Sequence, residues 1–189
     1  MQLELVHPNS FILRQKCENF DFKNLKFDPI NFAQEMIKFM YEHNGIGLAA
    51  NQIGFNVNVF CMRGSPENFV CYNPRIVDHG EEVVTLEEGC LTYPYLIIPL
   101  KRYKSIKVRF NTPNGDILTK KFSDMTARVV QHEMMHLNGQ LFWEGISRTQ
   151  FERARKKNNL NISYNGMIYQ KHEKRKKIIH PDENCWYVS

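Results

Sequence analysis

The sequence lacks the segments that mark exported or membrane proteins. No stretch approaches the ~18 consecutive apolar residues of a membrane-spanning helix. The N-terminal MQLELVHPNS has no basic region followed by an apolar one, as a secretory signal would, and it is not the Arg- and Ser-rich segment of a transit peptide. We therefore expect a cytoplasmic protein that does not act at a membrane.

Cysteine is also scarce: the chain has five cysteines in 189 residues, an odd number without any CxxC pair. In a reducing compartment this excludes a disulfide framework. A domain of this length buries most of its surface and does not need such support. A lone cysteine is expected to be a small buried apolar side chain. The five are Cys17, Cys61, Cys71, Cys90 and Cys185.

Internal repeats and low-complexity linkers are absent as well. The net positive charge of the chain lies entirely at its C-terminal end. The formal net charge is +5. Residues 1–150 contain 16 Lys+Arg and 16 Asp+Glu, whereas residues 151–189 contain 9 and 4. This predicts a neutral folded domain over residues 1–150 and a basic C-terminal extension over residues 151–189.

Two helices are predicted, one near each end of the neutral domain. Asp28 can cap the first helix and Pro29 suits its first position. Apolar residues then recur at helical spacing until Asn44-Gly45 ends the helix. The second helix starts at Ser123 or Asp124 and ends near Asn138-Gly139.

Strand-like runs fill the sequence between these helices, and a hairpin turn is expected at residues 112–115. Strands in series flanked by helices indicate an α+β fold with mostly antiparallel sheets. The predicted strands cover residues 55–62, 68–72, 82–86, 95–98, 105–110 and 117–122.

The second helix contains QHEMMHLNG, in which His132 and His136 are four residues apart. Positions i and i+4 lie on one face of a helix, so both imidazoles can bind one cation. Glu133 lies about 100° further round the axis and can act on a water without being a ligand. This is the HExxH pattern of metallohydrolases, although an exposed helix with two histidines would look the same.

A third ligand would decide the class. Zincin proteases add a histidine or glutamate downstream, but His172 and His180 lie in the basic extension and Glu144 follows His136 too closely. Cysteine is the other option. Cys90 follows a predicted strand, and Gly89 lets the backbone approach a ligand closely.

Three motifs resemble those of the peptide deformylase family, which usually read GIGLAAPQ, EGCLS and QHEIDHLNG. Here they are GIGLAANQIG at residues 45–54, EGCLT at 88–92 and QHEMMHLNG at 131–139. The N-terminal VHPNSFILRQKCENF also resembles the family's opening, so that the similarity covers about residues 5–150. Three spaced motifs are far more specific than HExxH alone.

The resemblance implies mostly antiparallel sheets around a central HExxH helix, and one divalent metal held by Cys90, His132 and His136. The metal is typically Fe(II), and Zn(II) or Ni(II) can replace it; the ligands alone do not choose. The implied reaction removes the formyl group from N-formylmethionine of nascent polypeptides and releases formate.

The resemblance also assigns the remaining roles. Glu133 is the general base, and the Gln52 side chain and Leu91 N–H are the donors for the oxyanion. The matching candidates for the methionine slot are Ile46, Leu86, Met125 and Val129, and ordinary core packing would explain each of them nearly as well. Gly45 and Gly47 are expected to let a substrate strand pair with the backbone.

The sequence departs from the family pattern at two positions near the site. Asn51 stands where proline is common, and Met135 replaces the usual aspartate, which removes a negative charge beside the ligands. Arg102 matches a family arginine that could pair with Glu88; it could equally be a solvated strand charge.

The basic extension predicts a short helix over residues 147–157, followed by the charge run KHEKRKK at 171–177. Such a run is either a solvated face or a contact to ribosomal RNA. We expect no DNA partner. Two alternative functions stay open from sequence: a catalytically weak or inactive relative that binds the ribosome or RNA, and an HExxH metallopeptidase.

Overall fold

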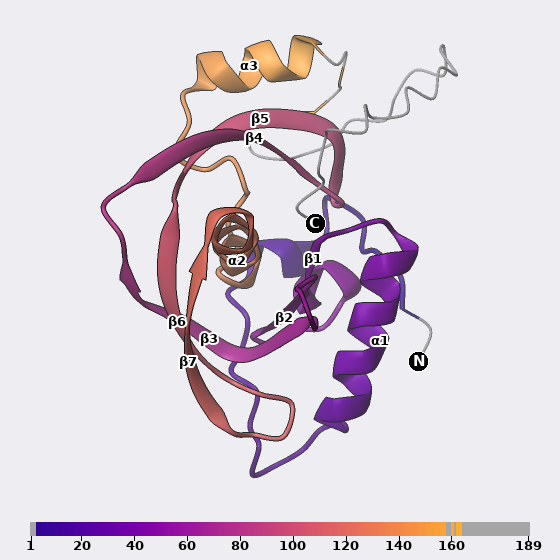
Figure 1. Cartoon of the computed structure of the whole chain (residues 1–189). Coiled ribbons are helices and arrows are strands. Elements are labelled where there is room, and N and C mark those ends of the chain that lie inside the picture. Colours follow the sequence, from indigo (N-terminus) through magenta and orange to yellow (C-terminus); the bar gives the residue numbers. More distant parts are fainter. Residues whose placement is uncertain (1–2, 158–159, 161, 164–189) are drawn as a thin grey trace.

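The structure is a computed structural model that describes residues 3–157, 160 and 162–163 (Figure 1). Two antiparallel sheets surround the helix α2 (Asp124–Leu137). One sheet has the order β1 (Gly47–Ala49), β2 (Val59–Met62), β3 (Phe69–His79), β6 (Ser105–Asn111) and β7 (Ile117–Ser123). The other pairs β4 (Val83–Cys90) with β5 (Tyr93–Tyr103). The predicted α+β fold around a central HExxH helix is confirmed.

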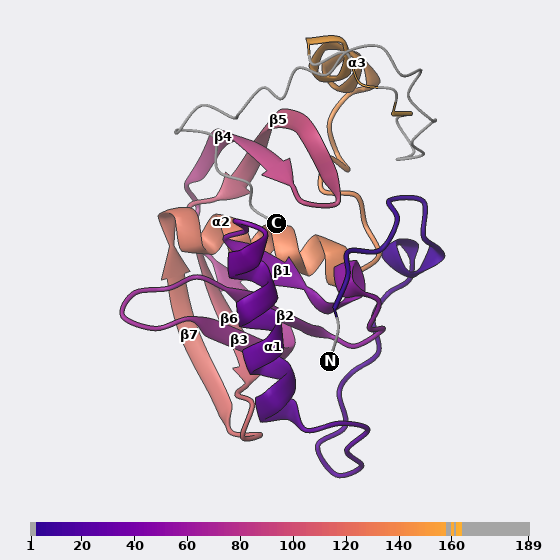
Figure 2. The same cartoon turned by 90° about the vertical axis from the view of Figure 1, so that its right-hand side faces the viewer.

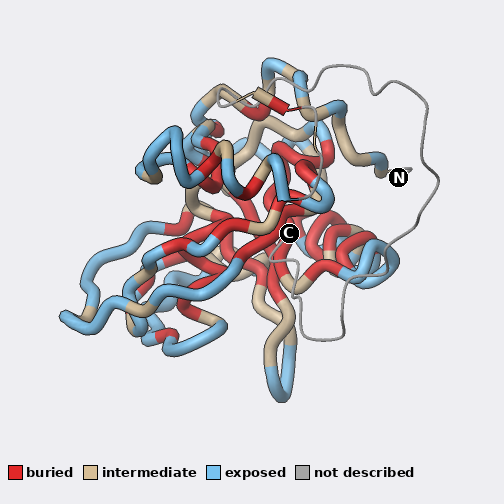
Figure 3. Tube along the Cα trace, turned by 90° about the horizontal axis from the view of Figure 1, so that it is seen from above, coloured by how far each residue is buried: buried red, intermediate tan, exposed pale blue. Residues whose placement is uncertain are grey.

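Helix α2 lies between the two sheets (Figures 1 and 2). The hairpin of β4 and β5 arches over one side of it, and the five-stranded sheet curves round the other. Helix α1 (Pro29–Glu42) packs on the β1–β2 end, and α3 (Arg148–Lys157) lies on the outer side of β5. Buried residues gather at the centre of the molecule (Figure 3), so α2 brings its histidines into a dry interior.

The two long helices start differently. Asp28 caps α1 as predicted, because its carboxylate accepts hydrogen bonds from the Ile30 and Asn31 amides. The predicted capping of α2 is wrong for Ser123, whose side chain makes no capping bond. Ser123 is the last residue of β7 and still pairs with Ser105 of β6. The chain therefore passes directly from strand to helix.

Every predicted run overlaps a strand of the structure, but the lengths differ, and the three-residue β1 was not predicted. Residues 95–98 are part of the eleven-residue β5, and the run from 82 extends as β4 to Cys90. Pro94 and Pro99 hid this length in the sequence; both strands of a two-stranded sheet are edges, and edges tolerate proline. Of residues 55–62, the part at 59–62 is strand. The hairpin turn at 112–115 is confirmed, with Gly115 at φ 91°.

The predicted short basic helix is α3. Ser147 and Gln150 cap it reciprocally: the Gln150 amide donates to Ser147 Oγ, and the Ser147 amide donates to Gln150 Oε1. Phe151 is buried against Trp143, with ring centroids 5.3 Å apart. The helix therefore crosses the predicted boundary at residue 150 and packs on the body. The run at 171–177 and Cys185 lie outside the described residues.

Within the described part of the chain, no helix has the length and apolar character needed to cross a bilayer.

Candidate metal centre

Cys90, His132 and His136 come together between α2 and the β4–β5 hairpin. Their candidate ligand atoms all lie within 4.8 Å of one another, and all three residues are buried. Cys90 Sγ lies 3.2 Å from His136 Nε2. Burial lowers the pKa of both imidazoles, so they are neutral and their lone pairs are available.

The hairpin explains how Cys90 reaches a helix more than 40 residues later. Cys90 is the last residue of β4 and pairs with Tyr93, so Leu91 and Thr92 form the turn. The hairpin folds back at the end of α2 that carries His136. Burial raises the pKa of the Cys90 thiol to about 12. A thiolate at this position therefore requires a positive charge beside it.

The orientation of His132 is set by Glu88. His132 Nδ1 lies 3.0 Å from Glu88 Oε2, and an ionised carboxylate only accepts, so Nδ1 carries the proton. Nε2 is then an acceptor. It is buried and has no hydrogen-bond partner among the residues that the structure describes. This is the arrangement in which a carboxylate fixes the tautomer of a metal-binding histidine.

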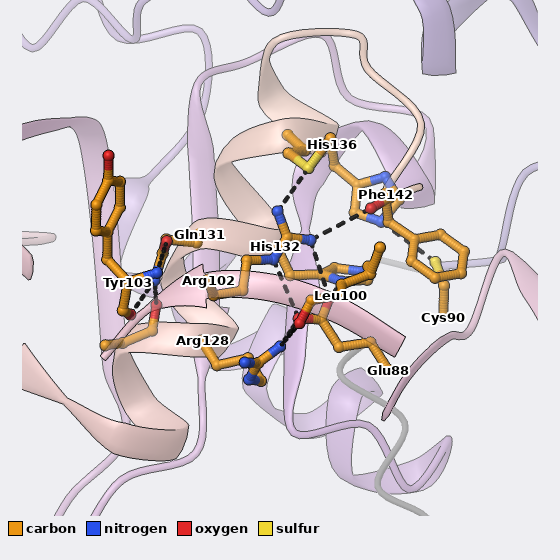
Figure 4. Close-up of polar contacts among 12 residues, drawn as sticks. Glu88, Cys90, Leu100, Arg102, Tyr103, Arg128, Gln131, His132, His136 and Phe142 are labelled. Carbon is orange, nitrogen blue, oxygen red and sulfur yellow. Dashed lines mark hydrogen bonds and ion pairs between the residues drawn. The ribbon is translucent and has the colours of Figure 1, made fainter. Parts of the chain in front are cut away.

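Glu88 is held in turn by two arginines (Figure 4). Arg102 donates through Nε and Nη2 to the two carboxylate oxygens, at 3.0 and 2.9 Å, and Arg128 donates through Nη1 to Oε1. Burial opposes ionisation, but the hydrogen bonds from His132 and Arg102 outweigh it and lower the pKa of Glu88 to about 2. Glu88 is therefore ionised at neutral pH.

This cluster was only partly predicted from the sequence. The pairing of Arg102 with Glu88 is confirmed. Arg128 was missed, since its partner lies 40 residues earlier; an arginine on the buried side of the HExxH helix was the available signal. Arg128 also donates to the carbonyls of Val84 and Leu100, so it fastens α2 to both strands of the hairpin.

The three residues fit a divalent cation. Metal–nitrogen and metal–sulfur bonds are about 2.0–2.3 Å, so two ligands of one ion lie within about 4.6 Å of each other, close to the observed spread. The lone pair of the buried Nε2 of His132, which has no partner among the described residues, can be satisfied by a bound cation. One cysteine and two histidines also leave a coordination position for substrate, as catalytic sites do.

Glu133 lies beside the triad without belonging to it. It is buried, and the approach of its carboxylate depends on Gly47: a Cβ at Gly47 would overlap Glu133 Oε1 and lie 2.8 Å from Val129 Cγ1. The space that a side chain at Gly47 would need is therefore occupied by the Glu133 carboxylate. Glu133 is also close enough to Cys90 to raise the pKa of its thiol further, in addition to the larger effect of burial.

The predicted oxyanion donors flank Cys90. Gln52 lies in the 3-10 helix η2 (Ala50–Ile53); its Oε1 accepts from the Ala49 amide at 2.8 Å. Its Nε2 donates to Thr92 Oγ1 at 2.9 Å and lies 3.8 Å from Cys90 Sγ. Leu91 follows Cys90 at the hairpin turn.

The predicted methionine slot is spread over several elements. Val129 is buried on α2 and Ile46 packs against the same cluster, whereas Leu86 and Met125 are 45% and 37% exposed. A Cβ at Gly45 would lie 3.0 Å from Leu91 Cδ1. A cavity of about 800 Å³ lies elsewhere, between residues 16–19, β3, β6 and the end of α2, and contains none of the three ligands.

Of the residues rejected as third ligands, Glu144 is the one that the structure describes, and it is not part of the metal cluster. Glu144 accepts a hydrogen bond from the Leu141 amide, three residues earlier. His172 and His180 lie outside the described residues. Met135 has its sulfur 2.9 Å from Arg102 Nη1, so the residue that replaces the usual aspartate contacts the cation of the Glu88 cluster.

Known proteins are similar to this chain in both sequence and fold. A peptide deformylase of Synechocystis sp. is 37% identical over 151 residues, which cover 76% of this chain and 79% of the relative. The chloroplastic peptide deformylase 1B of Solanum lycopersicum is 36% identical over 163 residues, covering 82% and 57%. The crystal structure of a Synechococcus elongatus peptide deformylase superposes with a TM-score of 0.75 at 28% identity, covering 83% and 86%.

The family model for polypeptide deformylase matches residues 3–152, which include all three motifs and the whole Cys–His–His cluster. The chain therefore belongs to the polypeptide deformylase family, whose known function is removal of the N-formyl group.

Proposed function

We propose that this chain hydrolyses the formyl amide of N-formylmethionine on nascent polypeptides and releases formate. One divalent cation is held by Cys90, His132 and His136. The observation that supports this most directly is the buried cluster of these three residues beside Glu133.

The cation is Fe(II) in the native protein, and Zn(II) or Ni(II) can take its place. Sulfur and imidazole ligands suit all three, so the donor set does not select among them. When bound, the cation would act as a Lewis acid, which lowers the pKa of a bound water and polarises the formyl carbonyl group.

Glu133 is the general base. Its carboxylate accepts a proton from the attacking water and delivers it to the leaving amine nitrogen. Its place against the backbone of Gly47 supports this role, since the contact fixes the carboxylate in a buried position next to the triad. The neighbouring His132 keeps its proton on Nδ1, which donates a hydrogen bond to the Glu88 carboxylate.

The oxyanion of the tetrahedral intermediate is stabilised by the Gln52 side-chain amide and the Leu91 N–H. Each such donor is typically worth about 2.7–4 kcal/mol of the barrier. The position of Gln52 Nε2, close to Cys90 Sγ, supports the assignment. Thr92 Oγ1 accepts a hydrogen bond from Gln52 Nε2 and so holds the side-chain amide in place. The same Nε2 would then also donate to the oxyanion of the substrate.

The substrate backbone pairs with β1, which is an edge strand of the five-stranded sheet. Gly45 and Gly47 flank the approach, although the space at Gly47 is used by Glu133. The methionine side chain occupies a slot between the hairpin and α2. The residues assigned to it are Ile46, Leu86, Met125 and Val129.

The catalytic domain comprises residues 1–150, and the basic extension over 151–189 contacts ribosomal RNA. Arg153 and Lys156 are exposed on α3 while Phe151 and Ala154 are buried in the cluster that contains β5 residues, which leaves these two cations available to phosphates. Lys157 is also exposed, but its Nζ lies 4.0 Å from Glu87 Oε1. Binding to purified ribosomes should weaken as salt rises; salt-insensitive binding would oppose this contact. The expected location is the cytoplasm, although one relative is chloroplastic by name.

The decisive experiment measures formate release from a formyl-Met peptide, with the unformylated peptide as control. Formate from the first and no cleavage of the second supports the proposal. An inactive RNA-binding relative would release no formate, and a metallopeptidase would cleave the unformylated peptide.

A further inference from the structure

The neutral residue Asn51 makes a long-range contact to the ligand helix. Asn51 is completely buried in η2, and its Nδ2 donates to the backbone carbonyl of His136 at 2.6 Å. The two residues are 85 positions apart in the chain. A buried amide that reaches one particular carbonyl at this distance fixes the separation of the two elements.

The carbonyl of His136 lies in the last turn of α2, where backbone acceptors run out of helical donors. The Gly139 amide donates to it at 2.9 Å, and Asn51 supplies a second donor from outside the helix. The amide orientation follows from this contact, because the reversed amide would place oxygen against oxygen. Asn51 therefore restrains the turn that carries the His136 side chain.

The neighbouring residue makes the matching contact to the other ligand-bearing element. Gln52 is tied to Thr92, two residues after Cys90 in the hairpin. The four-residue η2 thus bridges the end of α2 and the turn of β4–β5. A shift of η2 would move both the Gln52 amide and the backbone of His136.

On the basis of the proposed function, we propose that Asn51 is a positioning residue that sets the distance between the His136 and Cys90 ligands and aligns the Gln52 donor. The Asn51 amide supplies a side-chain donor that proline, common at this position of the family motif, lacks. Outer hydrogen bonds of metal ligands typically affect metal affinity or activity about 10–100-fold.

The test compares Asn51→Leu with Asn111→Leu. Asn111 donates in the same way to the carbonyl of Gly115, but in the β6–β7 hairpin, so it controls for the loss of one amide-to-carbonyl bond. Both proteins are loaded with Co(II) and challenged with a chelator. We expect Asn51→Leu to release cobalt about tenfold faster than wild type, with an altered thiolate-to-cobalt absorption band and lower kcat at similar KM. Asn111→Leu should release cobalt at the wild-type rate.

Equal cobalt release and unchanged spectra in Asn51→Leu and wild type would overturn the proposal and leave Asn51 with a structural role only. If Asn51→Leu does not fold, Asn51→Ala is compared in the same way. Failure of the proposed function is separate, because it would appear as no formate release by cobalt-loaded wild type, whatever the cobalt release rates of the variants.

Discussion

The two histidines of the triad lie one turn apart on α2, but their surroundings differ in kind. His132 is backed by charge: Glu88 accepts from its Nδ1 and is itself held by two guanidinium groups. His136 makes its direct polar contacts with neutral groups, a thiol at its Nε2 and an asparagine amide on its carbonyl, while Arg14 and Arg102 act on it only as nearby charges. Both are completely desolvated, so the comparison isolates the means of positioning from the degree of burial.

The difference teaches which contacts are costly to break. A buried charge that loses its partner costs about 3–5 kcal/mol, because the remaining ion stays in a low dielectric. A neutral hydrogen bond contributes only about 0.5–1.5 kcal/mol net. The His132 side should therefore govern folding stability, and the His136 side should govern the fine geometry of the metal centre.

The largest effect is expected from Glu88→Ala, which leaves Arg102 and Arg128 buried without their carboxylate. We expect a loss of about 3–5 kcal/mol in the free energy of unfolding, measured by denaturant titration. Glu82→Ala is the control, since its pair with Lys104 is exposed and its loss should change stability little. Equal destabilisation by the two variants would break the comparison.

The predictable part of the site was local in sequence. The spacing of His132 and His136 gave their shared face, and the glycine before Cys90 pointed to the third ligand. Arg128 could not be assigned because its partner Glu88 is distant in the chain, and only the fold shows that α2 passes under the hairpin. The role of Gly47 was equally hidden, since the space that it leaves is filled by a side chain 86 positions later.

The next effect concerns the base Glu133, a buried carboxyl group that lies outside the Glu88 cluster. Glu133→Ala should keep its metal but lose about 10²–10⁴-fold in deformylation. Gly47→Ala should displace the same carboxylate and lose less, because the side chain can partly adjust. Gly80→Ala, whose added Cβ meets only the Ser105 hydroxyl and nearby atoms, should remain active. Wild-type turnover by Glu133→Ala would require another base.

The smallest effect should come from Met135→Asp. Glu88 is one carboxylate between two guanidinium groups, and Met135 contacts the Arg102 cation through its sulfur. A second carboxylate there should raise the free energy of unfolding by about 0.5–1 kcal/mol, as a partly exposed pair does. A lower melting temperature would mean that the packing of the methionine outweighs the charge.

The most direct test of the central assignment is the metal content of Cys90→Ala, measured by elemental analysis beside wild type and Cys71→Ala. Cys71 is equally buried but lies in β3, away from the triad. We predict about one metal per chain in wild type and Cys71→Ala, and far less in Cys90→Ala, because two histidines alone bind weakly. Full occupancy in Cys90→Ala would contradict the Cys90, His132 and His136 site.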